Sequence, residues 1–222
     1  MPVYNEKNTI NEVMDNVLKL GIVKELIVVD DASTDGTREL LENNKFTDRV
    51  KKIYHKKNSG KGSAVRSAQK EITGEVVVIQ DADLEYDPEE LAELCRPIRK
   101  GVADVVYGSR LWGGKPQRVY MFWHLMGNRF LSFVADILYN ATLTDIETCY
   151  KVFKSDIFKR INIKSNDFSM EPELTAKVLK KKLRVYEMPI SYYGRTYEEG
   201  KKITWLHGFS ALWALLKYRF VD

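Results

Sequence analysis

Residues 75–83 read Glu-Val-Val-Val-Ile-Gln-Asp-Ala-Asp, an apolar run that ends in two carboxylates. The run is short, rich in valine and preceded by Gly74, which is typical of a buried strand that follows a helix stop. Residues 25–31 repeat the pattern with Glu-Leu-Ile-Val-Val-Asp-Asp. Ligands of open α/β sheets bind outside the carboxyl ends of the strands. The two stretches therefore predict an α/β protein with a polar site where these strands end.

Helices and strands alternate around these runs in the first half of the chain. Apolar residues spaced three and four apart predict helices, whereas short apolar runs predict strands. We expect helices over residues 8–20, 37–44 and 63–72, a helix that opens with Asp87 as cap and Pro88, and strands over residues 25–30, 50–55, 75–80 and 103–107. This alternation predicts a mostly parallel sheet, flanked by helices, with right-handed crossovers.

The second half of the chain is richer in aromatic residues. We expect helices over residues 119–143, 173–181 and 203–221, and strands over residues 148–154 and 184–193. No repeat or low-complexity linker divides the chain. We therefore expect one domain over residues 1–202, which includes a helical region at about 116–144, and an amphipathic helix over 203–222. Only Met1 precedes Pro2, so the first strand is expected to be very short or to begin upstream of Met1.

Composition excludes several classes of protein. The 222 residues are 44% hydrophobic and 30% charged, which excludes a mainly disordered chain. The net charge of +4 is too small and too dispersed to indicate a nucleic-acid partner. Two cysteines make no disulfide framework and favour a reducing compartment. No window of about 20 residues is apolar enough to span a bilayer.

The pair Asp81 and Asp83 is the sharpest local signal. Residues two apart point the same way in an extended chain, and Glu85 extends the series. Such carboxylates suit Mg²⁺ or Mn²⁺, which also binds the oxygens of a diphosphate. A solvated turn is the alternative, but the position directly after a buried strand favours the metal site.

Three other polar segments are candidates for binding an anionic ligand. Asp31 follows a strand and could bind a base or ribose, or could only cap the next helix. Lys61 lies between two glycines at a helix start, which suits a phosphate, although a flexible basic loop fits equally well. Arg195 and Lys201 flank a glycine-containing loop that could close over an anion or simply be solvated.

Taken in order, the motifs of the chain resemble the family 2 glycosyltransferases of the GT-A fold. The chain looks most like the polyprenyl-phosphate branch, the dolichol-phosphate mannose synthase type. The resemblance rests on these stretches: Pro2-Val-Tyr-Asn-Glu6, Val28-Val-Asp-Asp31, Ser33-x-Asp-Gly-Thr37, Asn58-x-Gly-Lys-Gly62, Asp81-Ala-Asp-Leu84, Gly108-Ser-Arg110, Asp145-x-Glu-Thr-Cys-Tyr-Lys-Val-Phe153, Glu171-Pro-Glu-Leu174 and Arg195-Thr-Tyr-Glu-Glu-Gly-Lys201.

The resemblance implies a donor site built from distant parts of the chain. It assigns the nucleotide to Pro2, Tyr4 and Glu6, the base to Val29 and Asp31, the diphosphate and metal to Asp81, Ala82 and Asp83 with Glu85, and the donor's charge to Arg110, Arg195 and Lys201. Lys61 is added from its glycine-flanked position.

The implied reaction moves mannose or glucose, with inversion, from a nucleoside-diphosphate sugar to a dolichyl or undecaprenyl phosphate. Asp83, Arg110 and Asp145 are the expected catalytic residues. Asp145 could orient the acceptor, or act as a base for a hydroxyl acceptor. An acceptor phosphate is already anionic and needs a cradle, for which the candidates are His124, Asn128 and Arg129. Ordinary polar-face positions are the alternative for this trio.

A lipid acceptor gives the aromatic helices a function at a membrane. Trp and Tyr favour the membrane interface, and in-plane amphipathic helices bind there, although core packing explains aromatic residues equally well. We therefore expect a peripheral, monotopic protein on the cytoplasmic face of the membrane. The residues concerned are Trp112, Tyr120, Phe122, Trp123, Phe130, Phe133, Trp205, Phe209, Trp213, Leu216 and Phe220.

Two other functions stay open at this point. One is a GT-A transferase that acts on a soluble sugar or polysaccharide, and the other is a non-catalytic subunit that binds nucleotide sugars. GDP-mannose and UDP-glucose are both reasonable donors for the first reading.

Overall fold

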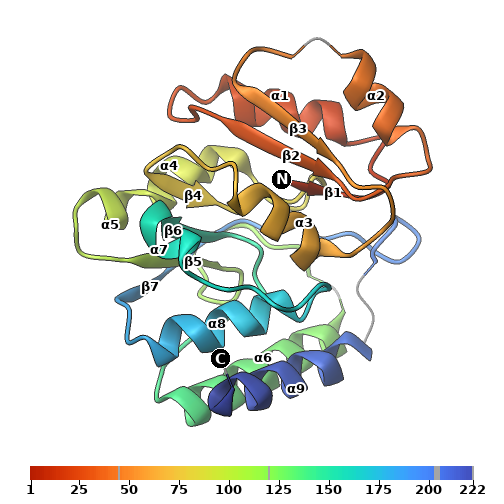
Figure 1. Ribbon diagram of the computed structural model, residues 1–222. Helices are drawn as coiled ribbons and strands as arrows, with labels where there is room; N and C mark the ends of the chain where they lie inside the picture. Colours follow the sequence, from red (N-terminus) through yellow and green to blue (C-terminus); the bar gives the residue numbers. More distant parts are fainter. Residues whose placement is uncertain (45, 120, 203–205, 222) are drawn as a thin grey trace.

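The computed structural model describes residues 1–44, 46–119, 121–202 and 206–221, without the side chain of Leu206. Three parallel strands form the first sheet: β1 (Pro2–Val3), β2 (Leu26–Asp30) and β3 (Val50–Tyr54), with β2 in the centre. Figure 1 shows this sheet, in red and orange, at one end of the molecule. β1 has only two residues, as expected, and the amino group of Met1 donates to the Ile27 carbonyl at 2.8 Å.

The second sheet contains β4 (Val76–Val78), β5 (Val105–Ser109), β6 (Lys151–Lys154) and β7 (Val185–Pro189), in the order β4-β6-β5-β7. β5 and β7 are parallel, whereas β6 is antiparallel to both β4 and β5. The expectation of a mostly parallel sheet is therefore wrong for this half. The cause is the long excursion from Arg110 to Asp145, whose two ends meet at the edge where β5 ends. β6 then starts near that edge and runs back beside β5.

Helices surround the two sheets. The described helices are α1 (Ile10–Lys19), α2 (Thr37–Asn43), α3 (Lys61–Gln69), the 3₁₀ helix η1 (Pro88–Glu90), α4 (Leu91–Leu94), α5 (Arg96–Arg99), α6 (Phe122–Tyr139), α7 (Ser155–Lys159), α8 (Met170–Lys180) and α9 (Leu206–Phe220). The Asp87 side chain accepts from the Glu89 amide, which confirms the expected cap. The helix expected to open at Asp87 is divided into η1, α4 and α5, and the sequence pattern did not predict α7.

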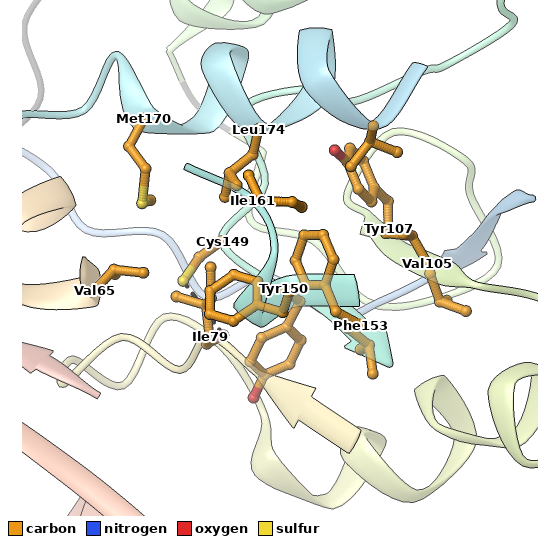
Figure 2. Packing of buried hydrophobic residues seen from close by; sticks show 14 of the residues in the cluster. Val65, Ile79, Val105, Tyr107, Cys149, Tyr150, Phe153, Ile161, Met170 and Leu174 are labelled. Atoms are coloured by element: carbon orange, nitrogen blue, oxygen red, sulfur yellow. Dashed lines mark hydrogen bonds between the residues drawn. The ribbon is translucent and has the colours of Figure 1, made fainter. Parts of the chain in front are cut away.

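The main core lies between the second sheet and the helices beside it. Tyr107, Tyr150 and Phe153 are fully buried in it, and Figure 2 shows Tyr150 and Phe153 beneath α8. The first sheet has its own smaller core, in which Ile10 and Met14 of α1 are fully buried. Both faces of β2 are covered, which explains its continuous apolar run.

α6, α8 and α9 pack side by side at the end of the molecule farthest from the first sheet (Figure 1). α9 is fixed there by the fully buried Leu215 and by the Tyr139 hydroxyl, which donates to the Leu215 carbonyl at 2.7 Å. In the part of the chain that the structure describes, no helix is both long enough and apolar enough to cross a bilayer.

Candidate active site

An open cavity of about 910 Å³ lies at the carboxyl ends of β1, β2, β4 and β5. The structure brings most of the expected site residues together on its wall. Those that line it are Pro2, Tyr4, Glu6, Asp31, Lys61, Asp81, Ala82, Asp83, Glu85, Arg110, His124, Asn128, Arg195 and Lys201. Val29, Asp145 and Arg129 do not line the cavity, and each has a different environment.

Asp81 and Asp83 lie beside each other and each has a cationic partner. Lys61 Nζ is 2.8 Å from Asp81 Oδ1, and Arg195 Nη2 is 2.9 Å from Asp83 Oδ2. Burial alone would raise the pKa of Asp81, but the Lys61 ammonium outweighs it and lowers that pKa. Burial and the charges of Asp81 and Glu85 raise the pKa of Asp83 to about 7. Burial and the repulsion from neighbouring carboxylates thus outweigh the attraction of the Arg195 guanidinium for the Asp83 carboxylate.

Glu85, which is expected to be a metal ligand, is bound by protein groups in this structure. One of its carboxylate oxygens accepts from the Arg195 amide at 2.8 Å, and the other from the Tyr192 hydroxyl at 2.7 Å. Across the described ranges, no group of three His, Cys, Asp or Glu side chains has the geometry of a metal site. Asp81 and Asp83 still offer the oxygen ligands that Mg²⁺ and Mn²⁺ prefer, so the pair fits such an ion in its chemistry.

Arg195 is the centre of a charge cluster on the cavity wall. Its guanidinium lies 3.2 Å from Glu6, 2.9 Å from Asp83 and 3.4 Å from Glu85. Asp83 and Glu85 are neighbours in the sequence, but Glu6 and Arg195 come from distant segments, so the sequence could not show that these four residues meet.

The carboxylate of Asp31 is bound by the loop in front of α3. It accepts from the amides of Ser59 and Gly60, at 3.0 and 2.6 Å, and lies 2.6 Å from His55 Nδ1. His55 Nε2 in turn lies 2.8 Å from Ser67 Oγ. Nothing in the sequence indicated that His55 lies beside Asp31, since a single histidine after a strand indicates no particular role. Asp31 therefore shapes the loop that carries Lys61 as well as lining the cavity.

Gly60 is required where it stands. Its φ of +90° is unfavourable for other residues, and a Cβ there would lie 2.4 Å from the Asn166 carbonyl oxygen. We expect Gly60→Ala to lower the free energy of unfolding by about 2 kcal/mol or more, as measured by urea denaturation. Gly21→Ala is the control, because a Cβ at Gly21 meets nothing within 4 Å. Equal stability of the two variants would contradict this account of the loop.

Arg110 is held by Asp145 in a bidentate ion pair. Arg110 Nε and Nη2 donate to Asp145 Oδ2 and Oδ1 at 2.7 and 2.8 Å, and Asn128 Nδ2 donates to Oδ1 at 2.7 Å. Asp145 is fully buried, and its two oxygens are already used. This environment differs from that of the acceptor-orienting group or base expected of Asp145, which would need an oxygen that faces a ligand.

Val29 and Arg129 also do not line the cavity, and their positions in β2 and α6 explain why. Val29 is fully buried in the core of the central strand β2, so its side chain does not reach the cavity. Arg129 is exposed on α6, while His124 and Asn128 line the cavity from the same helix. Residues one apart on a helix point about 100° away from each other. His124 lies 2.8 Å from the Tyr197 hydroxyl, and burial together with Lys201 lowers its pKa.

A comparison of the sequence with models of protein families finds a clear match. The model of glycosyl transferase family 2 matches residues 1–161 of the 222. The chain belongs to glycosyl transferase family 2.

Two curated relatives show how this family 2 chain compares with others. Glycosyltransferase AglJ of Haloferax volcanii is 29% identical over 195 residues, which is 87% of this chain and 62% of AglJ. The UDP-N-acetylglucosamine–dolichyl-phosphate N-acetylglucosaminyltransferase of Methanococcus voltae is 27% identical over 236 residues, which is 97% of this chain and 93% of that protein. The chain therefore spans less than the full length of AglJ.

A solved structure supports the fold of this family 2 chain. Glucosyl-3-phosphoglycerate synthase from Mycobacterium tuberculosis, crystallised with Mn²⁺, UDP and phosphoglyceric acid, superposes with a TM-score of 0.73 at 16% identity. The match covers 100% of this chain and 77% of that one. It confirms the expected α/β fold.

The sequence did not indicate a role for Lys202, which follows the expected site residue Lys201 in the same loop. Lys202 Nζ lies 2.6 Å from Glu6 Oε1, donates to the Tyr4 carbonyl and lies 5.8 Å from the centre of the Tyr4 ring. Lys201, the expected residue, also lines the cavity, and burial lowers its pKa. Adjacent lysines in a loop give no signal that separates their roles.

A buried chain of charges connects this site to the second half of the family 2 fold. Lys61 Nζ, besides its pair with Asp81, is 3.1 Å from Glu171 Oε1. Lys151 is fully buried, and its Nζ donates to Glu171 Oε2 at 2.6 Å and to the Ile146 carbonyl at 2.9 Å. A buried charge needs such partners, so the position of Lys61 depends on α8 and β6.

α6 and α9 expose a set of apolar side chains that we name the aromatic face. Each helix carries them along one side, because positions three and four apart lie above one another. Its members are Phe122, Trp123, Phe130, Phe133, Ile137, Phe209, Trp213, Leu216 and Phe220. Trp123 is 81% and Phe220 is 83% exposed, so core packing does not explain these residues. Tyr120 and Trp205 lie outside the described residues.

Proposed function

We propose that this chain transfers mannose or glucose, with inversion, from a nucleoside-diphosphate sugar to a polyprenyl phosphate at a membrane surface. One observation carries the lipid part of the proposal. The aromatic face begins at the mouth of the cavity, since Phe122 both lines the cavity and is 61% exposed. A polar site for a phosphate thus continues into an apolar surface suited to an isoprenoid chain. The dolichyl-phosphate substrate named for the Methanococcus voltae relative supports it.

The donor diphosphate is proposed to bind between Lys61 and Arg195, with Tyr4 and Asp31 on the nucleotide side. Mg²⁺ or Mn²⁺, held by Asp81 and Asp83, would neutralise charge on the leaving nucleoside diphosphate. The chain's own cations add to this stabilisation, because they are fixed in place before the reaction and need no reorganisation.

The acceptor phosphate is proposed to bind beside Arg110, with His124 as a hydrogen-bonding neighbour. Asp145 and Asn128 then act as positioning residues, since they fix the guanidinium rather than face the cavity. An anionic phosphate attacks without a proton being removed from it, so this arrangement needs no carboxylate base.

The membrane part of the proposal fits the charges that border the aromatic face. Arg129, Lys217 and Arg219 are exposed on the same two helices. Apolar side chains insert at the interface while nearby cations attract anionic headgroups. The protein is therefore proposed to bind peripherally on the cytoplasmic face, through α6 and α9.

Vesicle binding tests this surface. We expect the double variant Trp123→Ser and Trp213→Ser to partition at least about tenfold less into vesicles of phosphatidylcholine and phosphatidylserine in a sedimentation assay. Tyr186→Ser, which removes an exposed aromatic residue of β7, should leave partitioning unchanged.

Sugar transfer to polyprenyl phosphate in the same vesicles should fall in parallel with partitioning. Failure of the wild-type chain to bind vesicles would contradict the lipid acceptor. Transfer to a water-soluble sugar that survives the double substitution would favour the soluble-acceptor alternative.

A further inference from the structure

Glu147 is a carboxylate on the cavity wall that none of the roles above uses. It belongs to the connection between α6 and β6, and its half-buried side chain lines the cavity near Arg110. Within the described ranges, no hydrogen bond or ion pair holds its carboxylate. Burial raises the pKa of Glu147, as expected for a carboxyl group that lacks a partner.

The other carboxylates around the cavity are committed to partners. Glu6, Asp83 and Glu85 bind Arg195, and Asp81 binds Lys61. Burying a polar group without a partner costs free energy, so a carboxylate left open in this way needs an explanation. Glu147 therefore stands apart as the acceptor that the protein itself does not satisfy.

A second carboxylate lies on the same wall. Glu171 is 4% exposed, its Oε2 accepts from Lys151, and its Oε1 is ion-paired with Lys61 Nζ at 3.1 Å. Lys61 Nζ thus lies between Asp81 and Glu171. Glu171 therefore has a cationic partner at each oxygen, and Glu147 has none among the described residues.

We propose that Glu147 binds hydroxyl groups of the sugar that is transferred and so contributes to selection of the sugar. The inference rests on the proposed function, because it needs a nucleotide sugar in the cavity. Sugar hydroxyls are donors, and a carboxylate accepts from them in strong, charge-assisted bonds. Tyr4 and Asp31 are proposed for the nucleotide and Lys61 and Arg195 for the diphosphate, which leaves the open carboxylate of Glu147, beside Arg110, for the sugar.

Calorimetric titration separates the sugar from the nucleotide. The ligands are UDP, GDP, UDP-glucose and GDP-mannose with Mn²⁺, and the proteins are wild type, Glu147→Ala and the exposed-site control Glu12→Ala. Glu147→Ala is expected to keep the Kd of the nucleoside diphosphate within about twofold and to weaken the matching nucleotide sugar at least about tenfold. Equal weakening of both ligands, or of neither, overturns the inference.

Donors that lack single hydroxyls identify the contact. Removing the hydroxyl that Glu147 binds should weaken binding to the wild type and change binding to Glu147→Ala by less than about twofold. If every deoxy donor weakens the two proteins equally, Glu147 does not bind the sugar.

Thermal unfolding distinguishes recognition from a structural role. Glu147→Ala removes an unpaired carboxylate, so its Tm should equal or exceed that of the wild type. A clear fall in Tm would mean a structural role and overturn the inference. Wild type that binds none of the four ligands would refute the proposed function as well, whereas wild type that binds them with an unaffected Glu147→Ala refutes the inference alone.

Discussion

Asp83→Ala is expected to lose sugar transfer by about 10³-fold while the protein stays folded. Asp83 is one of two carboxylates proposed to hold the divalent ion, and it is also a partner of Arg195. Loss of one fixed group that stabilises charge in a transition state typically costs about 10²–10³-fold in rate, and loss of a metal ligand adds to that cost. Initial rates with GDP-mannose and UDP-glucose measure the effect.

A readout other than activity links this effect to the ion. Mn²⁺ should raise the Tm of the wild type and of the control Asp15→Asn, whose carboxylate is exposed on α1, but not that of Asp83→Asn. The pKa of Asp83 is raised to about 7, so below that pH the ion must displace a proton. Stabilisation by Mn²⁺ should therefore decline as the pH falls from 8 to 6. A shift retained by Asp83→Asn would exclude this residue as a ligand.

Asp145→Ala is expected to lower the free energy of unfolding by about 3–5 kcal/mol. Removing one partner of a buried ion pair leaves the other charge unpaired in a poorly solvated place, which here is the Arg110 guanidinium. Sugar transfer should fall as well, because Arg110 loses the contacts that orient it. Urea denaturation gives the stability, and initial rates give the activity.

An exposed pair provides the matched control for that prediction. Asp156 and Arg160 lie 2.8 Å apart on the surface, with side chains 61% and 73% exposed. Asp156→Ala should change stability by only about 0.5 kcal/mol or less. The variant Asp145→Asn keeps the shape of the side chain and should retain more stability than Asp145→Ala. A loss below about 1 kcal/mol in Asp145→Ala would contradict the assigned role.

The local pattern was enough to predict most of the first half of the fold. The run before Asp31 is continuous and apolar because β2 is buried on both faces, whereas β4, in the run before Asp81, is only half-buried. The polar ends of both runs line the same cavity, as expected for a site at the carboxyl ends of strands. The direction of β6 could not be predicted, since an apolar run is the same for either direction. Its direction depends on contacts between Arg110 and Asp145, which are 35 residues apart.

The site was predictable where the chain itself groups the residues, and not elsewhere. Asp81 and Asp83 are neighbours in the sequence, so their shared position followed from strand geometry. Lys202 and Glu6 are in contact although they are 196 residues apart, and the sequence around neither residue predicts this contact. Glu147 could not be predicted either. It stands out because its carboxylate has no hydrogen-bond or ion-pair partner among the described residues, and a sequence does not show which side chains are paired.

The meeting of Arg110 and Asp145 also joins the two ends of the segment between them. Residues 111–144 leave β5 and return towards β6 at this ion pair, while Leu131, Ala135 and Leu143 of the segment are buried in the main core. The segment carries α6, on which the proposed acceptor neighbour His124 lies, whereas the residues proposed to bind the donor lie outside it. On this proposed assignment, different stretches of one chain bind the acceptor and the donor, so substitutions on α6 can alter acceptor binding without changing a residue proposed for the donor.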